Sequence, residues 1–302
     1  MQCSRLFSIT LLMLFLASPN AAKADKHPLK ISANEKPIIV WARTDFAPVF
    51  ILKGKYSNQG IGDEAIKLFK SKLKHYNHIS ADMSLKRAMQ LAKEGQMICH
   101  VSLVNSKERQ QFMDFSQPLM RLYANGLVTT KGSLHKFGVS ADKINPVSLT
   151  ALTQKPVSIS IHDARAYSAY IDEVIKKNRS KPNSIFKVKT GQKDQERLIQ
   201  MVENHRLDAM IGRPEEAQFS KLQHNIKEDL YFVPLKGQPE TSMGHIGCAK
   251  GDWNKALINT LNQMIEKDEE LKSTIFEAYQ KWLPSQLRTT REAFNYPLIP
   301  QP

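Results

Sequence analysis

Short apolar runs alternate with segments of helical periodicity through most of this 302-residue chain. Residues 37–41 form an apolar, β-branched run that predicts a buried strand, and residues 49–52 predict a second short one. One helix is expected from Asp63 and another after the capping residue Ser84, because apolar residues recur in both at helical spacing. A strand over 97–102 follows. This order of strands and helices predicts a sheet covered by helices.

The same alternation is repeated in a second unit that begins near residue 156. An apolar strand over 122–130 and a polar loop over 131–142 precede it. The strands expected in this unit are 157–161, 186–188 and 207–211, and the apolar segments 231–235 and 244–248 follow them. The expected helices are 167–175, 195–203, 253–265 and 271–282. Trp253 and Trp282 lie in the apolar stripes of the last two helices, so we interpret both as core residues. The pattern predicts an α/β chain of about two domains.

Residues 1–24 have the order of features that is typical of a secretory signal peptide. Arg5 precedes an unbroken apolar run over 11–17, and Ala22-Lys23-Ala24 supplies an A-x-A cleavage site. The run is too short to span a membrane, and no later segment approaches the necessary length. We therefore expect a mature chain that starts at Asp25 and acts outside the cytoplasm.

The chain has a large excess of basic residues. Its formal net charge of +14 falls by two, to +12, when Arg5 and Lys23 leave with the signal peptide. A basic exterior is compatible with nucleic acid, with anionic lipid or simply with solubility. Because Lys and Arg are spread without a polybasic block or an aromatic-interleaved repeat, and because the chain is secreted, we do not expect it to bind nucleic acid.

Two cysteines, Cys99 and Cys248, remain after cleavage of the signal peptide. An oxidising compartment favours a disulfide between them, and two separate apolar thiols are the alternative. Two isolated cysteines without a C-x-x-C motif or a nearby His pair are poor zinc ligands. We therefore expect no metal site and no cofactor.

The segment 102–118 is the best candidate for a binding loop. Ser102 ends an apolar stretch, and Ser106 and Arg109 lie where a short polar helix begins. Hydroxyls, backbone N–H groups and a guanidinium at such a point suit an anion, because a helix N-terminus favours negative charge and arginine binds a carboxylate with two hydrogen bonds. The alternative is that Ser106 is only a helix cap and Arg109 a solvated surface charge.

Several motifs, in order, resemble the bacterial extracellular solute-binding proteins of family 3, the polar amino-acid receptors of ABC importers. The resemblance covers nearly the whole mature chain. It is carried by D-F-A-P at 45–48, G-I-G-D at 60–63, the hydroxyl-x-E-R loop and D-F-S-x-P sequel at 106–118, L-D-A at 207–209, K-G-D at 250–252 and Y-Q-K-W at 279–282. Each motif alone is weak, but their order identifies the chain as resembling this family.

The resemblance implies an α/β, two-lobe periplasmic binding protein fold of type II, with two crossing hinge strands and a central ligand cleft. Lobe 1 would comprise 25–126 and 244–302, and lobe 2 would comprise 127–243. The crossings would fall near 124–128 and 242–247, which places Cys99 and Cys248 in the same lobe and favours their disulfide. Binding would close the lobes over the ligand.

The resemblance also implies roles for residues of the first lobe. Phe46 matches the aromatic residue that stacks over the ligand, and Arg109 matches the arginine that binds its carboxylate. Ser102 and Ser106 lie on the same strand end and loop. Val104 stands where the family usually has Ser or Thr, and this departure removes one side-chain donor to the carboxylate.

In the second lobe, the loop 162–168 stands where the family has a Gly-Thr turn, but it has no glycine. Asp163 and Ser168 are candidate ligand contacts there and Arg165 a candidate source of positive charge, and surface positions are the alternative for each. Arg213 falls where amino-acid receptors supply a carboxylate for the ligand's ammonium, and a guanidinium cannot accept those hydrogen bonds. Glu215 or Glu216 from the next turn is the alternative carboxylate, and a ligand other than a plain α-amino acid is the simpler interpretation. With Arg43 also expected near the cleft, the four arginines indicate an anionic or dicarboxylate-like ligand.

The predicted function is a monomeric periplasmic receptor that delivers a small polar, anionic or amino-acid-like solute to an inner-membrane ABC permease. A sensor that presents the ligand to a membrane signalling protein is an alternative that the sequence does not separate from import. A periplasmic enzyme such as a dehydratase on the same fold is disfavoured. Its acid–base candidates, His162 with Asp163 or Glu215 with Glu216, are adjacent residues that usually point apart.

Overall fold

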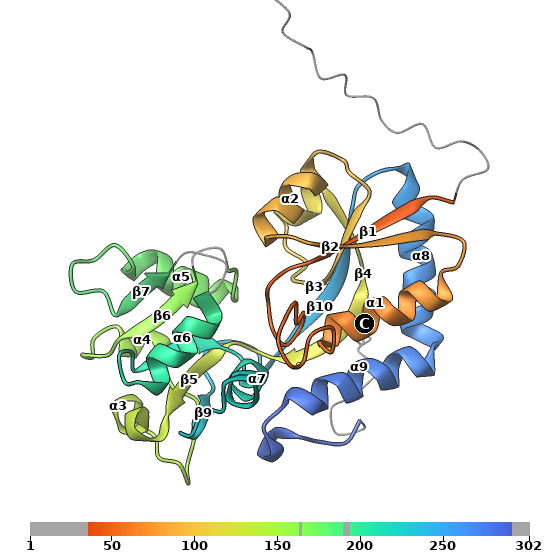
Figure 1. The fold of residues 1–302 in the computed structure, drawn as a ribbon. Helices are drawn as coiled ribbons and strands as arrows, with labels where there is room; N and C mark the ends of the chain where they lie inside the picture. The colour runs from red at the N-terminus through yellow and green to blue at the C-terminus, as the bar shows by residue number, and fades with distance from the viewer. Residues whose placement is uncertain (1–35, 163–164, 190–193, 292–302) are drawn as a thin grey trace, which may run out of the picture. The chain divides into compact units, whose positions relative to one another are not determined.

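The computed structural model describes residues 36–162, 165–189 and 194–291. The predicted signal peptide, residues 1–24, lies outside this part of the chain. The described residues form two five-stranded sheets, each covered by helices (Figure 1). The two-lobe α/β fold class expected from the sequence is therefore confirmed.

The first sheet combines strands from the beginning and the end of the chain in the order β2-β1-β3-β10-β4. Its strands are β1 (Ile38–Arg43), β2 (Asn77–Asp82), β3 (Ile98–Leu103), β4 (Met113–Tyr123) and β10 (Thr241–Ala249). The first three strands are parallel, whereas β10 is antiparallel to both β3 and β4. Figure 1 shows the late strand β10 beside the early strands β3 and β4.

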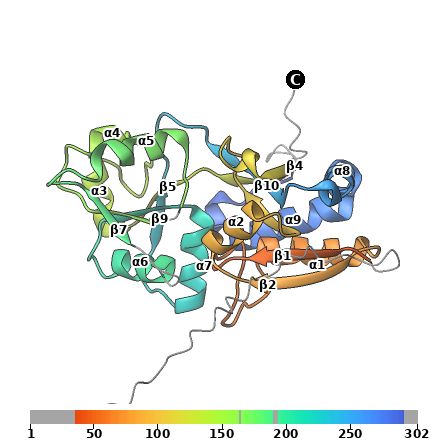
Figure 2. The same cartoon turned by 90° about the horizontal axis from the view of Figure 1, so that it is seen from above.

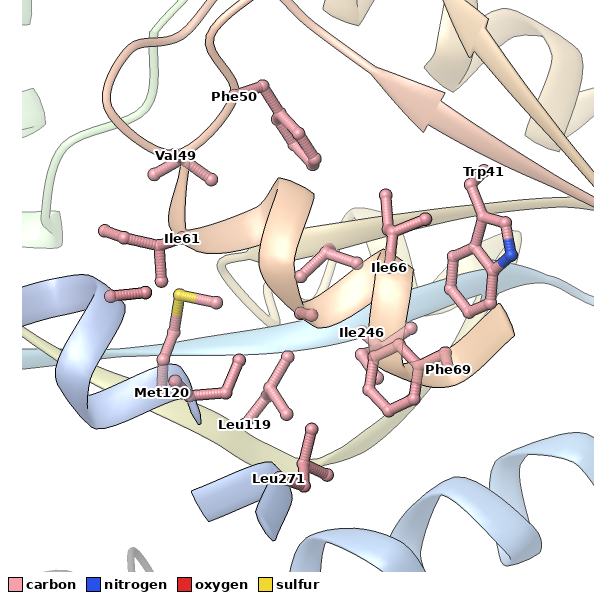
Figure 3. Packing of buried hydrophobic residues seen from close by; sticks show 14 of the residues in the cluster. Trp41, Val49, Phe50, Ile61, Ile66, Phe69, Leu119, Met120, Ile246 and Leu271 are labelled. Carbon is pink, nitrogen blue, oxygen red and sulfur yellow. The ribbon is translucent and has the colours of Figure 1, made fainter. Parts of the chain in front are cut away.

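Helices cover both faces of the first sheet. They are α1 (Ile61–Lys72), α2 (Leu85–Lys93), α8 (Asp252–Lys267) and α9 (Glu269–Trp282). Residues of α1, α8 and α9 pack on one face in a cluster that includes Trp41 and Phe69, whose ring centroids are 5.5 Å apart (Figure 3). The helix α2 covers the other face. Trp282 is fully buried and Trp253 partly buried, which confirms both as core residues.

The second sheet is built from the middle of the chain in the order β7-β6-β8-β5-β9. Its strands are β5 (Gly126–Thr130), β6 (Ile159–His162), β7 (Phe186–Lys189), β8 (Ala209–Gly212) and β9 (Leu230–Val233). Its helices are α3 (Leu134–Phe137), α4 (Leu149–Leu152), α5 (Ala169–Asn178), α6 (Asp194–Glu203) and α7 (Pro214–His224). Helices α3 to α5 pack on one face, and α6 and α7 pack on the other (Figure 2).

The chain changes sheet twice. It leaves β4 at Tyr123 and enters β5 at Gly126, and it returns between the end of β9 at Val233 and the start of β10 at Thr241. Thr241 already pairs with Tyr123 of β4. The lobe boundaries expected at 126/127 and 243/244 remain predictions. The strand pairing shows only in which sheet each strand lies.

Two expected strands differ from those in the structure. Residues 49–52 do not form a strand, because the chain turns there and makes only an isolated bridge between Phe46 and Phe50. Val49 and Phe50 are buried because this turn packs against the first core, not because they lie in a sheet. The single strand expected over 122–130 is divided between β4 and β5, since the chain leaves one sheet before it joins the other.

The disulfide expected from the two cysteines is present. Cys99 of β3 and Cys248 of β10 are directly opposite each other in the antiparallel pair and are bonded. Both are fully buried. The bond therefore links strands that are 149 residues apart in the sequence and encloses the whole second sheet in its loop.

We expect this bond to stabilise the fold strongly, because it closes a long loop in the unfolded chain. Replacing both residues, in C99A/C248A, should lower the free energy of unfolding by about 2–5 kcal/mol. Urea unfolding followed by circular dichroism measures the change, with reduced wild-type protein as the control. Equal unfolding midpoints for wild type and variant would contradict the prediction.

Candidate functional site

The carboxyl ends of β1 and β3 lie side by side in the first sheet. The strands are parallel, with Ala42 opposite His100, and Thr44 Oγ1 lies 3.2 Å from His100 Nε2 just beyond the end of β1. The chain leaving β1 carries Phe46, and the chain leaving β3 carries Arg109. Binding sites of α/β proteins gather at this edge of the sheet, where loops follow parallel strands.

Ser102 lies in a bulge at the end of β3. His245 of β10 is opposite Leu103 and Gly247 is opposite His100, so β3 has one residue more than β10 over this interval. Ser102 takes a left-handed conformation with φ of 67°, which is unusual for a residue other than glycine. Its buried Oγ has no hydrogen-bond partner among the described residues. Bulges often redirect a side chain beside a functional site.

Arg109 follows this bulge at the start of the 3-10 helix η1 (Arg109–Gln111). Its backbone N–H donates to Ser106 Oγ at 3.3 Å, and its Nη1 donates to the Val104 carbonyl at 3.0 Å. Burial lowers the pKa of the Arg109 guanidinium, and the nearby Glu108 carboxylate acts in the opposite direction. No carboxylate of the described residues forms an ion pair with Arg109. Its remaining donors are thus available to an anion.

Phe46 lies on a loop that is tied to the start of α1. The Pro48 carbonyl accepts from Ile61 N–H at 3.0 Å, and the Val49 carbonyl accepts from Gly62 N–H at 2.7 Å. The Phe46 ring is half-buried against the first core. Its position is therefore set by backbone hydrogen bonds to α1.

Arg43 was expected near a ligand, but the structure places it in a network with acidic side chains of its own lobe. Its Nε and Nη2 donate to the two carboxylate oxygens of Asp82 at 2.7 and 3.0 Å, and its Nη1 donates to Asp63 at 3.1 Å and to Asn58. Asp63 in turn accepts from the backbone N–H groups of Ile51 and Gly60. Arg43 thus fixes the loop before α1.

The second sheet has an equivalent edge. The strands β6 and β8 are parallel, and Arg165 and Arg213 follow their carboxyl ends. β5 is antiparallel to β8 with Gly126 opposite Gly212, so Asn125 lies at the same edge. Two interactions join this edge to the first sheet: Arg165 lies over Phe46, and Arg213 donates to Ser242 Oγ of β10 at 3.2 Å.

Arg165 contacts residues of both lobes. Its Nη1 and Nη2 donate to the two carboxylate oxygens of Glu216 at 3.0 and 2.5 Å, and Nη2 also donates to Asn125 Oδ1 at 2.8 Å. The guanidinium carbon lies 4.8 Å from the centroid of the Phe46 ring and 5.2 Å from that of Tyr167. Burial lowers the pKa of Arg165, but the facing Glu216, together with Tyr167 and Glu215, raises it overall.

Arg213 and Glu215 are both buried where α7 meets the first lobe. Glu215 Oε2 accepts from the Tyr279 hydroxyl of α9 at 3.4 Å, whereas Glu215 Oε1 and Arg213 Nε have no partner among the described residues. Burial lowers the pKa of Arg213 and raises that of Glu215 to about 7. The positive charge of Arg213 opposes this rise, and the negative charge of Glu216 adds to it.

The structure thus brings Phe46, Arg165 and Arg213 to facing sheet edges, together with the loop that carries Ser102, Ser106 and Arg109. Asp163 lies outside the described residues. Ser168, the N-cap of α5, donates its hydroxyl to Gln238 Oε1 at 2.8 Å. Glu215 and Glu216 point to different partners, as expected for adjacent residues.

Three groups at the junction of the lobes were not expected from the sequence: Asn125, Tyr167 as a ring beneath Arg165, and Glu216 as the partner of Arg165. Glu216 is 51 residues from Arg165, and no local pattern joins the two. The loop without glycine and the two adjacent glutamates can be read from the sequence. The ion pair between Arg165 and Glu216 cannot, because it depends on the alignment of β6 with β8.

Two further searches covered the described residues only. No group of three or more His, Cys, Asp or Glu side chains is arranged to hold a metal ion. None of the helices combines the length and the apolar composition that crossing a membrane demands.

The strained backbone of Ser102 gives a first prediction for this site. Glycine accepts a positive φ without the steric cost, which is about 1 kcal/mol for other residues. Because glycine also has more freedom in the unfolded chain, S102G should raise the melting temperature by at most about 2–4 °C. S102A, which keeps the strain, is the matched control in differential scanning calorimetry. A lower melting temperature for S102G than for S102A would contradict the prediction.

The raised pKa of Glu215, about 7, gives a second prediction. Between the unfolded pKa near 4.5 and this value the folded state binds more protons than the unfolded state, so the contribution of Glu215 to stability is largest below pH 4.5 and is lost as pH rises through 7. E215Q should remove this fall, which amounts to at most roughly 3 kcal/mol.

Urea unfolding at pH 5 and pH 8 measures the difference. E277Q, on the exposed side of α9, is the matched control and should keep the wild-type pH dependence. An E215Q profile parallel to that of the wild type would show that Glu215 does not titrate in this range.

Comparisons with known proteins identify the fold. Neither a scan of protein-family models nor a search of curated proteins finds a match. Solved structures do match over most of the chain. One describes glutathione import in Gram-positive bacteria via GshT and the cystine ABC importer TcyBC of Streptococcus mutans; it has a TM-score of 0.61 and 16% identity, and the match covers 84% of this chain and 100% of that one.

Two more structures support the same fold. The amino acid ABC transporter substrate-binding protein AbpA from Streptococcus pneumoniae, bound to L-arginine, has a TM-score of 0.55 and 18% identity over 82% of this chain and 97% of its own. The BvgS periplasmic VFT2 domain of Bordetella pertussis has a TM-score of 0.57 and 17% identity over 82% and 94%. The chain therefore has the two-lobe α/β fold of substrate-binding proteins of amino-acid ABC transporters.

Proposed function

We propose that this protein is a periplasmic solute-binding receptor of the family 3 type, which binds a small polar anion or an amino-acid-like ligand between its two sheet edges. The observation that carries the proposal is Arg109. It lies at the carboxyl end of a parallel strand, is oriented by Val104 and Ser106, and has no ion pair among the described residues. An arginine oriented in this way suits the two oxygens of a carboxylate.

The charges at the junction favour an anionic ligand over a cationic one. Glu216 is already bound to Arg165, and the buried Glu215 has a raised pKa. In contrast, Arg109 lacks a counter-ion among the described residues, and Arg213 has an unpartnered Nε there. Since Arg213 stands where an amino-acid receptor would need a carboxylate, an α-ammonium group gains no partner from that position.

Delivery to an inner-membrane ABC permease is the biological role we propose, with the periplasm as the compartment. The similar structures include substrate-binding proteins of amino-acid ABC transporters, and residues 1–24 have the pattern of a signal peptide. The proposed role needs binding alone and no chemical step. The divergent partners of Glu215 and Glu216 give no support to an acid–base pair.

Isothermal titration calorimetry with a panel of acidic, zwitterionic and basic small molecules tests the proposal. We expect acidic compounds to bind best, and R109Q to weaken that binding roughly ten- to hundredfold, because a hydrogen bond to a charged group is worth about 1.5–3 kcal/mol. R87Q, which changes an exposed arginine of α2, is the matched control and should bind as the wild type does.

Two results would overturn parts of the proposal. Preference for an unmodified basic amino acid would exclude the anionic ligand class. Equal affinities of wild type and R109Q for a ligand that does bind would remove Arg109 from the site.

A further inference from the structure

Arg165 is held by the groups that proteins commonly use to recognise a guanidinium. The Glu216 carboxylate accepts from both terminal nitrogens, and the Asn125 side-chain carbonyl accepts a third hydrogen bond. The rings of Phe46 and Tyr167 lie within cation–π distance of the guanidinium carbon, at 4.8 and 5.2 Å. A forked carboxylate contact and aromatic faces are the two features that distinguish arginine recognition from lysine recognition.

Tyr167 and Glu216 are positioned by contacts that do not involve Arg165. The backbone N–H of His162 donates to the Tyr167 hydroxyl at 2.9 Å, which anchors that ring. A Cβ atom on Gly212 would lie 2.8 Å from Glu216 Oε2, so glycine leaves the space in which this carboxylate lies. The Glu216 side chain is only 1% exposed, and that of Arg165 is 13% exposed.

The contact also joins the two lobes. Phe46 belongs to the loop after β1 in the first lobe, whereas Arg165, Tyr167 and Glu216 belong to the second. A buried carboxylate without its cation is costly. The pairing of Glu216 with Arg165 therefore fixes the guanidinium at the position where it also covers the Phe46 ring.

We propose that Phe46, Asn125, Tyr167 and Glu216 form a guanidinium-binding site that the protein fills with its own Arg165, and that this internal occupant excludes free cationic ligands. The role of this site in ligand selection rests on the proposed function as a solute-binding receptor. Because Arg165 is tethered beside the site, its effective concentration exceeds that of any free guanidinium compound. The ring face of Phe46 is then closed to cations, while Arg109 remains available to an anion.

Chemical rescue tests this site directly. R165A leaves the aromatic and carboxylate groups in place and removes the occupant, so its melting temperature should fall below that of the wild type. Guanidinium chloride at about 10 mM, far below denaturing concentrations, should then raise the melting temperature of R165A by about 2–4 °C if it binds with millimolar affinity. Sodium chloride and ammonium chloride at the same concentration control for ionic strength and for unspecific cation binding.

The response should depend on the groups that line the site. R165A/E216Q, which lacks the carboxylate, and R165A/F46L, which lacks the ring, should lose the guanidinium response. Wild-type protein should show none, because Arg165 already fills the site. R87A, a matched loss of one exposed arginine, should also show none. In calorimetry, L-arginine should bind R165A at least tenfold more tightly than it binds the wild type.

The proposal is overturned if R165A gives no specific guanidinium response, or if the response is unchanged by E216Q. If R165A is not recovered folded, R165K provides the test: it keeps a tethered positive charge but lacks the fork, and should be less stable than the wild type. R165K as stable as the wild type would overturn the proposal in that case. The rescue does not involve Arg109, so it is independent of whether an acidic ligand is found.

Discussion

The pairing of β10 with β3 and β4 is the constraint on which the rest of the structure depends. It returns the chain to the first sheet after the entire second sheet has been built, and the Cys99–Cys248 bond fixes it. The bulge in β3 opposite β10 gives Ser102 its left-handed backbone and directs the following loop, which carries Arg109. The strand β10 also carries Ser242, whose hydroxyl accepts a hydrogen bond from Arg213 of the second lobe. One strand therefore holds the first lobe together and contacts the second.

Buried charge at the junction of the lobes is arranged in two ways. Arg165 and Glu216 neutralise each other with good geometry, so the pKa of Arg165 is raised despite its burial. Arg213 and Glu215 lack such a direct contact, and burial shifts the pKa of each toward its neutral form. A group that faces its counter-ion therefore stays charged when buried, whereas burial of groups without such a contact disfavours their charged forms.

Elements with a clear apolar pattern were predicted well, and the elements that were missed have physical reasons. None of the residues of the edge strand β2 is fully buried, so its sequence N-H-I-S-A-D lacks the strongly apolar face that marks a buried strand. The edge strand β4 contains Pro118, which an edge tolerates but which argues against a strand in a sequence. Helix α7 buries Glu215, Glu216 and Ser220 along with its apolar residues, so it lacks the apolar stripe that marks a helix.

The sequence by itself determined the α/β class, the repeated order of strands and helices in the two lobes and the core role of both tryptophans, whereas anion binding by the loop with Arg109 stays a prediction. These properties depend on local periodicity and on short motifs, which the linear order preserves. Only the tertiary structure decided that Arg43 binds Asp63 and Asp82, and that Arg165 lies between Phe46, Tyr167 and Glu216. The sequence presents these arginines alike, because a side chain's partner is set by strand register and by packing between segments far apart in the chain.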